Sequence, residues 1–176
     1  MSSVTLRNAN EADIDLIRDL TFKVWPQTYE QLLTPEQINY MLEIMYSKES
    51  LKKQMAEDHQ FIILYDNDIP IGFASYSEIE PQLFKLHKLY ILPAHHGSGK
   101  GRFVIDHIQN DILTKGAKAL QLNVNRNNIA KIFYERLGFE VIRTEDIDIG
   151  NGYFMNDYIM EKKLKNESST NKALKT

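Results

Sequence analysis

Three glycines at alternate positions, Gly97, Gly99 and Gly101, are interleaved with the cations Lys100 and Arg102. An apolar run ends shortly before them, and a segment with helical spacing follows. Bare backbone at the start of a helix presents unpaired N–H groups and a positive dipole end, which favours binding of an anion, usually a phosphate. A tight turn without a ligand is the plainer alternative, so the glycines alone leave both interpretations open.

The spacing of this loop disagrees with the two commonest phosphate-binding loops. A Walker loop needs four residues between its first glycine and a Gly-Lys-Ser/Thr unit, and Arg102 cannot supply the Mg²⁺-binding hydroxyl. The dinucleotide fingerprint needs a small residue where Val104 stands, and it belongs to the first βαβ unit of a domain. A nucleotide phosphotransferase therefore has no support here.

The composition is that of a globular protein with one domain. The chain has 176 residues, enough to bury a substantial core, and it contains no cysteine, which excludes disulfides and a cysteine nucleophile. A net charge of −3 gives no reason to expect nucleic acid as a partner. No apolar run is long enough to span a membrane, and Met1–Asn10 lacks a signal-peptide pattern. We therefore expect a cytoplasmic protein with no nucleic-acid or membrane partner.

Hydrophobic periodicity predicts an α/β chain with one mixed, mostly antiparallel sheet and helices on both faces. It predicts a single domain over 1–164 and a disordered polar tail over 165–176. Pro26 is expected to end the first helix, because proline disfavours a helical residue before it. The expected elements are strands at Val4–Asn8, Phe61–Tyr65, Ile69–Ser77, Leu83–Leu92, Leu120–Val124, Phe139–Arg143 and Tyr153–Leu164, and helices at Asn10–Trp25, after Thr34, at Lys48–Glu57, after the glycines and at Asn127–Leu137.

Two segments of the chain resemble signatures of the GCN5-related N-acetyltransferase (GNAT) family. Leu89–Pro93 followed by His96–Gly101 is similar to the acetyl-CoA-binding motif, an Arg or Gln, two residues, Gly, one residue, then Gly or Ala; His96 stands at the Arg or Gln position. Asn127–Phe139, NNIAKIFYERLGF, is similar to the second signature, an Asn, an Ala, a Tyr, then Leu-Gly-Phe. The order of the expected elements is also similar to that of the family's fold.

The resemblance implies transfer of an acetyl group from acetyl-CoA to a primary amine by direct attack. It implies that the strand before the glycines splays from its parallel neighbour, and that the pantetheine arm pairs there with main chain, as an added strand would. It places the pyrophosphate on the loop amides, where Lys100 and Arg102 either add charge or are solvated surface residues. The cofactor-binding residues so implied are Leu89, Tyr90, Ile91, His96, Gly97, Ser98, Gly99, Lys100, Gly101, Arg102, Asn127 and Asn128.

The catalytic residues implied are Tyr134, as general acid to the leaving thiolate, and His87, as general base. An alkyl amine with a pKa of about 10.4 is neutral to only about one part in 2,500 at pH 7, so a base, a water chain or a desolvating pocket must assist. His87 is alternatively an ordinary strand histidine, and Glu78 and Glu80 are rival bases. The adjacent pair at 95–96 has poor spacing for a metal ion, and we expect no metal.

The acceptor is the least defined part of the sequence. Trp25 and Tyr29 either wall a substrate pocket or only pack in the core, and Glu78 could bind a cationic substrate. We expect a small-molecule amine, a polyamine or an amino-acid derivative; a protein N-terminus or lysine is the alternative within enzymes. A non-catalytic acyl-CoA sensor is the alternative from another class, and a homodimer is an expectation from the family alone.

Overall fold

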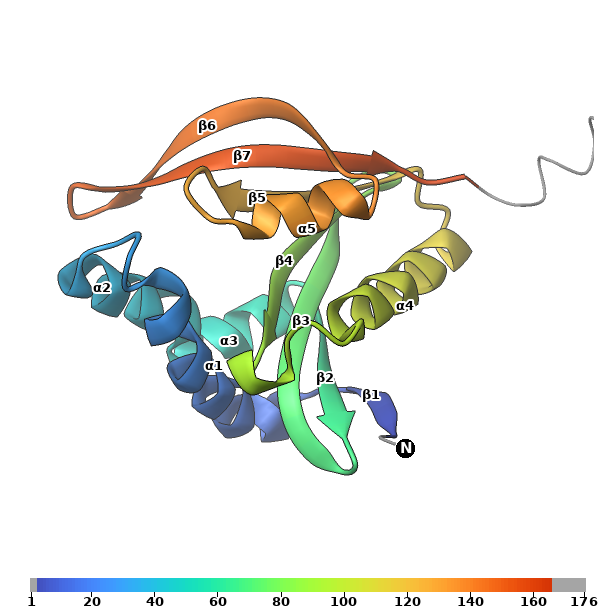
Figure 1. Cartoon of the computed structure of the whole chain (residues 1–176), viewed down its shortest axis with the longest axis horizontal. Coiled ribbons are helices and arrows are strands. Elements are labelled where there is room, and N and C mark those ends of the chain that lie inside the picture. Colours follow the sequence, from blue (N-terminus) through green and yellow to red (C-terminus); the bar gives the residue numbers. More distant parts are fainter. Residues whose placement is uncertain (1–2, 166–176) are drawn as a thin grey trace, which may run out of the picture.

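The computed structural model describes residues 3–165. Its seven strands form one sheet in the order β1-β2-β3-β4-β5-β7-β6 (Figure 1). The α/β fold class with a mixed, mostly antiparallel sheet is therefore confirmed; residues 166–176 of the expected tail lie outside the described range. The strands are β1 (Val4–Asn8), β2 (Gln60–Asp66), β3 (Ile69–Glu80), β4 (Leu83–Ile91), β5 (Ala119–Asn125), β6 (Glu140–Gly150) and β7 (Tyr153–Lys163). The helices are α1 (Ile14–Tyr29), α2 (Pro35–Tyr46), α3 (Lys48–Ala56), α4 (Lys100–Thr114) and α5 (Ala130–Arg136), with 3₁₀ turns η1 (Glu11–Asp13) and η2 (Pro93–His95).

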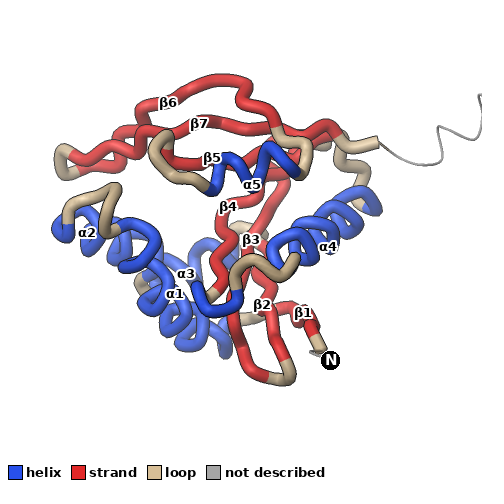
Figure 2. The backbone as a smooth tube through the Cα atoms, viewed as in Figure 1, coloured by secondary structure: helices blue, strands red, loops and turns tan. Residues whose placement is uncertain are grey.

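The helices cover the two faces of the sheet in separate groups, α1–α3 on one face and α4 with α5 on the other (Figures 1 and 2). Side chains of β2 alternate between the two cores: Ile62 and Leu64 pack with the α4 side, whereas Phe61 and Ile63 pack with the α1–α3 side. The sheet is thus buried on both faces along its centre. No helix among residues 3–165 is long and apolar enough to cross a membrane.

The centre of the sheet opens where β4 leaves β5. The two strands are parallel, as the crossover through α4 predicts, but their pairing stops at Leu86 and Leu122. A β-bulge at His87 shifts the register of β4 against β3, because Tyr76 pairs with Leu86 and Ser75 with Lys88. A bulge bends its strand. Beyond it, β4 stays with β3 and β5 stays with β7, so a gap opens between them.

The first helix passes through Pro26, and the prediction that it ends at Trp25 is wrong. Proline removes only its own N–H, and the helix continues because Pro26 O still accepts from Glu30 N at 3.0 Å. The hydroxyl of Thr28 also donates to Val24 O at 3.0 Å. The extra turn carries Tyr29 alongside the open end of the sheet.

The last helix starts at Ala130, three residues later than predicted, because two asparagine side chains hold a turn before it. Asn125 Oδ1 accepts from Asn127 N at 2.9 Å, and Asn128 Oδ1 accepts from Ala130 N at 2.9 Å. Such Asx turns compete with the helical backbone pattern. Of the two candidate asparagines in the second signature, Asn128 is therefore the one whose side chain bonds to the first residue of α5.

Two hydrogen bonds join α2 to the β6–β7 hairpin, although the segments are more than 100 residues apart in the chain. Tyr40 Oη donates to Ile149 O at 2.6 Å, and Gln37 Nε2 donates to Phe154 O at 2.9 Å. The ring of Tyr40 also packs on that of Tyr153, with centroids 5.3 Å apart. We call this contact the α2–hairpin bridge; it lies over the open end of the sheet.

Candidate active site

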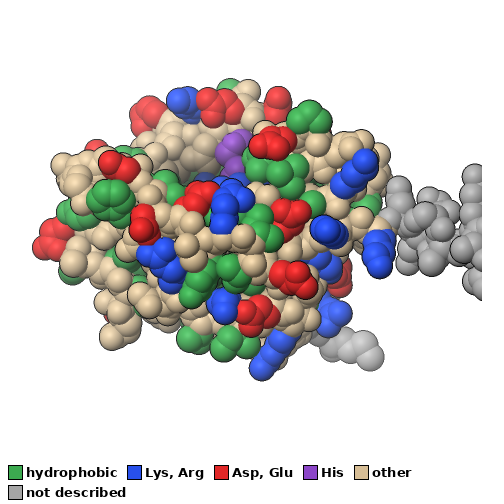
Figure 3. All heavy atoms as spheres, turned by 90° about the horizontal axis from the view of Figure 1, so that it is seen from above, with side chains coloured by type: hydrophobic (Ala, Val, Ile, Leu, Met, Phe, Trp, Pro, Cys, Tyr) green, Lys and Arg blue, Asp and Glu red, His purple; other side chains and the backbone are tan. Residues whose placement is uncertain are grey.

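A cavity of about 860 Å³ runs through the gap between β4 and β5, and we call it the central cavity. Its lining comes from α1, α2, β4, the glycine loop, β5, α5 and β7. Viewed from above, the surface is hollowed there and a histidine side chain is visible inside (Figure 3). The predicted site residues that line it are Trp25, Tyr29, His87, Leu89, Tyr90, Ile91, His96, Gly97, Gly99, Lys100, Gly101, Asn128 and Tyr134; Glu78, Ser98, Arg102 and Asn127 are not among its lining.

The glycine loop forms a cup of main-chain donors at one end of this cavity. Gly97 and Gly99 adopt left-handed φ angles of 80° and 77°, which glycine adopts without strain. Within residues 3–165 no acceptor pairs with the N–H groups of the six residues from 97 to 102; the first bond of α4 is Phe103 N to Gly99 O at 3.0 Å. Six free donors at a helix N-terminus suit a pyrophosphate.

Gly101 serves packing and not the turn. A Cβ built at this position would lie 2.9 Å from Cζ of Phe133 on α5. The bare Cα therefore lets the start of α4 approach α5 closely beside the loop. The three glycines that the sequence groups together have two different physical roles.

The side chains around the loop are mostly engaged with the protein itself. The side chain of His96 donates from Nε2 to Ile91 O at 2.6 Å, and the main-chain N–H of His96 donates to Pro93 O at 3.2 Å. The two bonds connect the loop to the end of β4. Lys100 Nζ lies 2.6 Å from Ser98 Oγ and 3.6 Å from Asp66 Oδ2. The main-chain N–H of His96 is therefore already paired, which disfavours a phosphate contact from it.

Two other predicted cofactor residues face away from the cavity. Arg102 is largely exposed, with Nε 3.9 Å from Asp106 on the next turn of α4. Asn127 is exposed in the turn before α5, whereas Asn128 lines the cavity. This end of the cavity therefore presents main-chain amides more than the cations of the loop.

Tyr134 lies on α5 at the edge of the gap. Its ring packs against Phe133 and Phe139, with centroid distances of 5.1 and 5.8 Å. Its hydroxyl has no hydrogen-bond partner among residues 3–165. Burial raises its pKa above the ordinary value for tyrosine, so the group is a protonated donor at neutral pH.

Trp25 and Tyr29 of α1 pack in the core and also line the central cavity. Trp25 is buried and packs on Tyr29 and Tyr46. The Tyr29 hydroxyl is 2.9 Å from that of Tyr90 on β4, which ties α1 to the strand beside the gap. The two alternatives for Trp25 and Tyr29 therefore do not exclude each other.

His87 lines the central cavity, but its surroundings do not suit a general base. Its Nε2 is 2.7 Å from Ser77 Oγ, and its ring stacks on His59 with centroids 4.1 Å apart. Burial, His59 and the nearby Lys85 lower the pKa of His87 to about 3. A ring with that pKa is neutral at pH 7 and binds a further proton weakly, which disfavours the base role expected for it.

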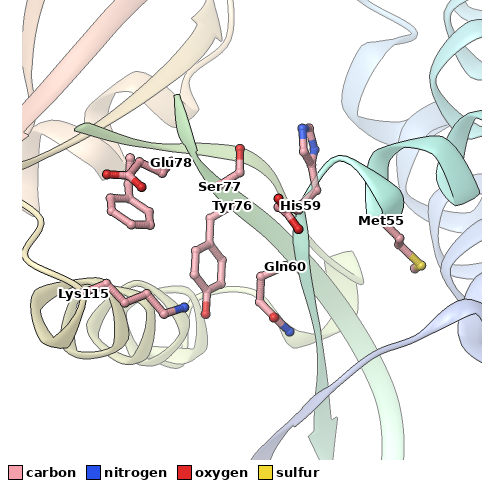
Figure 4. Close-up of a pocket in the computed structure, with 9 residues that line it drawn as sticks. Met55, His59, Gln60, Tyr76, Ser77, Glu78 and Lys115 are labelled. Atoms are coloured by element: carbon pink, nitrogen blue, oxygen red, sulfur yellow. The ribbon is translucent and has the colours of Figure 1, made fainter. Parts of the chain in front are cut away.

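Glu78 lies away from the central cavity, in a second cavity of about 490 Å³ beside β3. Figure 4 shows it there with Tyr76 and Lys115. Its Oε1 accepts from Gln82 N at 2.8 Å, in the turn between β3 and β4. The structure does not bring Glu78 together with Tyr134, so neither the base role nor the substrate role expected for Glu78 is favoured.

The acidic group that does line the central cavity is Asp157 on β7, which the sequence analysis did not select. Its side chain is buried, with 3% of the residue exposed, and Oδ2 lies 3.4 Å from Asn123 Nδ2. Burial raises its pKa, while Asn123 and Lys85 oppose that rise. The sequence contains a pattern that could have identified Asp157. Met155, Asp157 and Ile159 alternate along one face of a strand, which places a carboxylate at a core position.

A splayed pair of parallel strands that ends in a cup of amides fits an extended thioester cofactor with a pyrophosphate, and defines a class of acyl-CoA-dependent N-acyltransferases. The family model described as an acetyltransferase (GNAT) domain matches residues 29–162. The chain therefore belongs to the GNAT family, and it is an acetyl-CoA-dependent N-acetyltransferase.

Individual relatives agree with this assignment. An uncharacterized N-acetyltransferase of Mycobacterium tuberculosis is 25% identical over 154 residues, 86% of this chain and 98% of that protein. The [ribosomal protein bS18]-alanine N-acetyltransferase of Haemophilus influenzae is 28% identical over 126 residues, 72% of this chain and 81% of that protein. The crystal structure of PaiA N-acetyltransferase from Thermoplasma acidophilum in complex with coenzyme A is 26% identical, with a TM-score of 0.78 over 92% of this chain and 99% of that one.

Proposed function

We propose that this enzyme acetylates the primary amine of a small molecule by direct attack, with Tyr134 as general acid and Asp157 as general base. The observation that carries the proposal is the pairing of these two groups in one cavity: a tyrosine hydroxyl without a partner and a buried carboxylate both line it. Tyr134 on α5 packs with the α4 core, whereas Asp157 shares its face of β7 with Met155, which packs with the α1–α3 core. An acceptor can therefore reach the gap from one face and the cofactor from the other.

The cofactor end is built from main chain. Acetyl-CoA supplies an acetyl thioester when bound. Beyond Leu86 the edge of β4 that faces β5 has no strand partner, so the main chain of Leu89, Tyr90 and Ile91 can pair with an extended ligand. The amides of 97–102 would hold the pyrophosphate, and an amide of β4 would stabilise charge that develops on the carbonyl oxygen.

In the proposed reaction Asp157 accepts one proton and Tyr134 donates one. The neutral amine nitrogen forms the new bond to the acetyl carbon while the carbon–sulfur bond breaks. The amine loses a proton to the Asp157 carboxylate, and the Tyr134 hydroxyl gives a proton to the departing sulfur. Exchange with solvent then returns the proton from Asp157 to Tyr134. Positioned acids and bases of this kind contribute about 10²- to 10⁴-fold each.

The α2–hairpin bridge favours a small acceptor over a folded protein. Its bonds, from Tyr40 to Ile149 and from Gln37 to Phe154, hold the hairpin against α2 at the acceptor end. A polypeptide N-terminus would need this end open. The bS18-alanine relative makes a peptide with an N-terminal alanine the competing acceptor to include in any test.

The test is release of free thiol from acetyl-CoA across a panel of small amines and one alanine peptide, repeated with Tyr134→Phe. We expect turnover of a small amine and a large loss of it in the variant, with CoA affinity retained. Tight CoA binding without turnover on any amine would instead support an acyl-CoA sensor. Preference for the peptide would support acetylation of a protein N-terminus.

A further inference from the structure

Lys88 places an unpaired cation on the wall of the central cavity. It follows the bulge on β4, and its Nζ lies 5.1 Å from the centroid of the Tyr46 ring and 6.0 Å from that of Phe61. It makes no ion pair and no hydrogen bond within residues 3–165. The faces of aromatic rings attract a cation, but they supply no negative charge.

The groups around Lys88 disfavour its positive charge further. Lys85 on the same strand repels it, and burial disfavours its charge; together they lower the pKa of Lys88 to about 8. His59 and His87 also lie nearby, and both feel the charge of Lys88 as a repulsion. Asp157 lines the same cavity but does not offset this cation. The part of the chain that the structure describes therefore provides no counter-ion for Lys88.

From this arrangement we infer that the acceptor is an amino acid whose free carboxylate binds Lys88. The inference rests on the proposed function and names the class of its acceptor. The amine of such an acceptor would be directed to Asp157, so that each charge of the molecule meets an opposite charge of the cavity. A polyamine, which carries further cations and no anion, would be repelled by Lys88 and Lys85.

The remaining wall on the α1–α3 side defines the side chain of this amino acid. It is mostly apolar and aromatic, with two methionines of α2 whose flexible side chains fill irregular spaces, and its polar members, Gln27, Thr28 and Gln37, carry no charge. Such a wall suits an apolar or aromatic side chain better than a charged one. The residues concerned are Trp25, Tyr29, Met41, Met45, Phe154 and Met155.

The test compares amino acids with the amines that lack only their carboxylate, phenylalanine with phenethylamine and leucine with isopentylamine, and includes spermidine. Steady-state KM values and binding to the CoA complex by calorimetry are measured for the wild type, Lys88→Met and Lys88→Arg. Lys23→Met, an exposed lysine of α1, is the matched control. The calorimetric arm needs no turnover, and the melting temperature of each variant checks folding.

For the wild type we expect KM and Kd to be at least about tenfold lower for the amino acid than for its amine, as a charge-assisted hydrogen bond gives. Lys88→Met should abolish that preference and Lys88→Arg should keep part of it, whereas Lys23→Met should keep all of it together with the wild-type kcat for the simple amine. Equal Kd values in the wild type, a preference for spermidine, or a preference that survives Lys88→Met would overturn the inference. Selective binding without turnover would overturn the proposed function and leave the inference standing; turnover without selectivity would do the reverse.

Discussion

The two ends of the central cavity are built in different ways. At the cofactor end, main-chain amides of 97–102 and the free edge of β4 face the ligand, and Lys100 is tied to Asp66. At the acceptor end, side chains face it, and Lys88 has no counter-ion within residues 3–165. A main-chain site suits one cofactor shared by many relatives, whereas a side-chain site can change its acceptor by substitution. Variants at one end should therefore leave binding at the other unchanged.

The largest effect is expected for Asp157→Asn. Loss of the proton acceptor should lower kcat by about 10³-fold, measured with saturating acetyl-CoA and acceptor. The dissociation constant of CoA should stay within about twofold, because the amide is nearly isosteric and lies at the other end of the cavity.

Folding is the control for this variant. Burial raises the pKa of Asp157, so the ionised carboxylate destabilises the fold at neutral pH. Asp157→Asn should accordingly melt at or above the wild-type temperature, and Asp19→Asn on the exposed face of α1 should behave like the wild type in both assays. A kcat within twofold of wild type would remove Asp157 from the mechanism.

Tyr134→Phe is expected to lower kcat by about 10²-fold, because the hydroxyl donates a proton to the leaving thiolate. The hydroxyl makes no hydrogen bond within residues 3–165, so its loss should not disturb the fold. Tyr158→Phe, a tyrosine of β7 in the same core, is the matched control and should keep full activity. Rates would be compared with acetyl-CoA and with a thioester whose thiol is more acidic. A better leaving group should reduce the defect of Tyr134→Phe; an unchanged defect would argue for a packing role.

Lys88→Met should change the stability of the fold in a pH-dependent way. Because the pKa of Lys88 is lowered to about 8, the native state loses this proton before the unfolded chain does. The penalty of its charge is thus complete below pH 8 and disappears as pH rises toward 10.5. Lys85, His59 and His87 are present in both proteins, so their titration largely cancels in the difference.

The measurement is urea unfolding of the wild type and of Lys88→Met between pH 7 and pH 10. After a discount for the partial exposure of Lys88, we expect the variant to be more stable by about 2 kcal/mol at pH 7, and the gain to shrink at the alkaline end. A gain that does not depend on pH would contradict a lowered pKa for Lys88 in the folded protein.

The smallest effect is expected at the glycine loop. Gly99→Ala places a side chain at a φ of 77°, a left-handed backbone conformation that costs about 1 kcal/mol for alanine. The free loop should therefore leave this conformation, and CoA binding must supply the free energy that restores it. The CoA dissociation constant should rise about fivefold with the acceptor KM unchanged. Gly116→Ala, with a similar φ of 83° at the far end of α4 and open space around it, is the control. Equal losses of CoA affinity in both variants would contradict a special role for the loop.

The sequence predicts the strand, the loop and the helices of the cofactor end well because their signals are local. Glycines, a preceding apolar strand and the NNIAKIFYERLGF segment lie within about 50 residues, and periodicity places them on one parallel crossover. The fold class followed from the same periodicity. The helix through Pro26 was missed because burial of Val24 and Trp25, directly before the proline, outweighs the loss of a single N–H donor, and this is a tertiary effect.

The acceptor end could not be predicted in the same way, because distant segments build it. Lys88 faces Tyr46 only because the bulge at His87 sets the register, and Asp157 enters the cavity only through the pairing of β7 with β5. Glu78 and His87 were predicted from their residue types and from their places on two neighbouring strands. The structure places one in another cavity and stacks the other on His59.

The central claim, that main-chain amides beside the β4–β5 gap hold acetyl-CoA, is tested most directly by hydrogen–deuterium exchange of the wild type with and without saturating CoA. The amides of 97–102, which have no acceptor within residues 3–165, should exchange quickly in the free protein and be strongly protected with CoA. Amides of 88–91 should also gain protection, and those of the β6–β7 turn at 150–152 should not change. Equal exchange of 97–102 in both states would contradict the account.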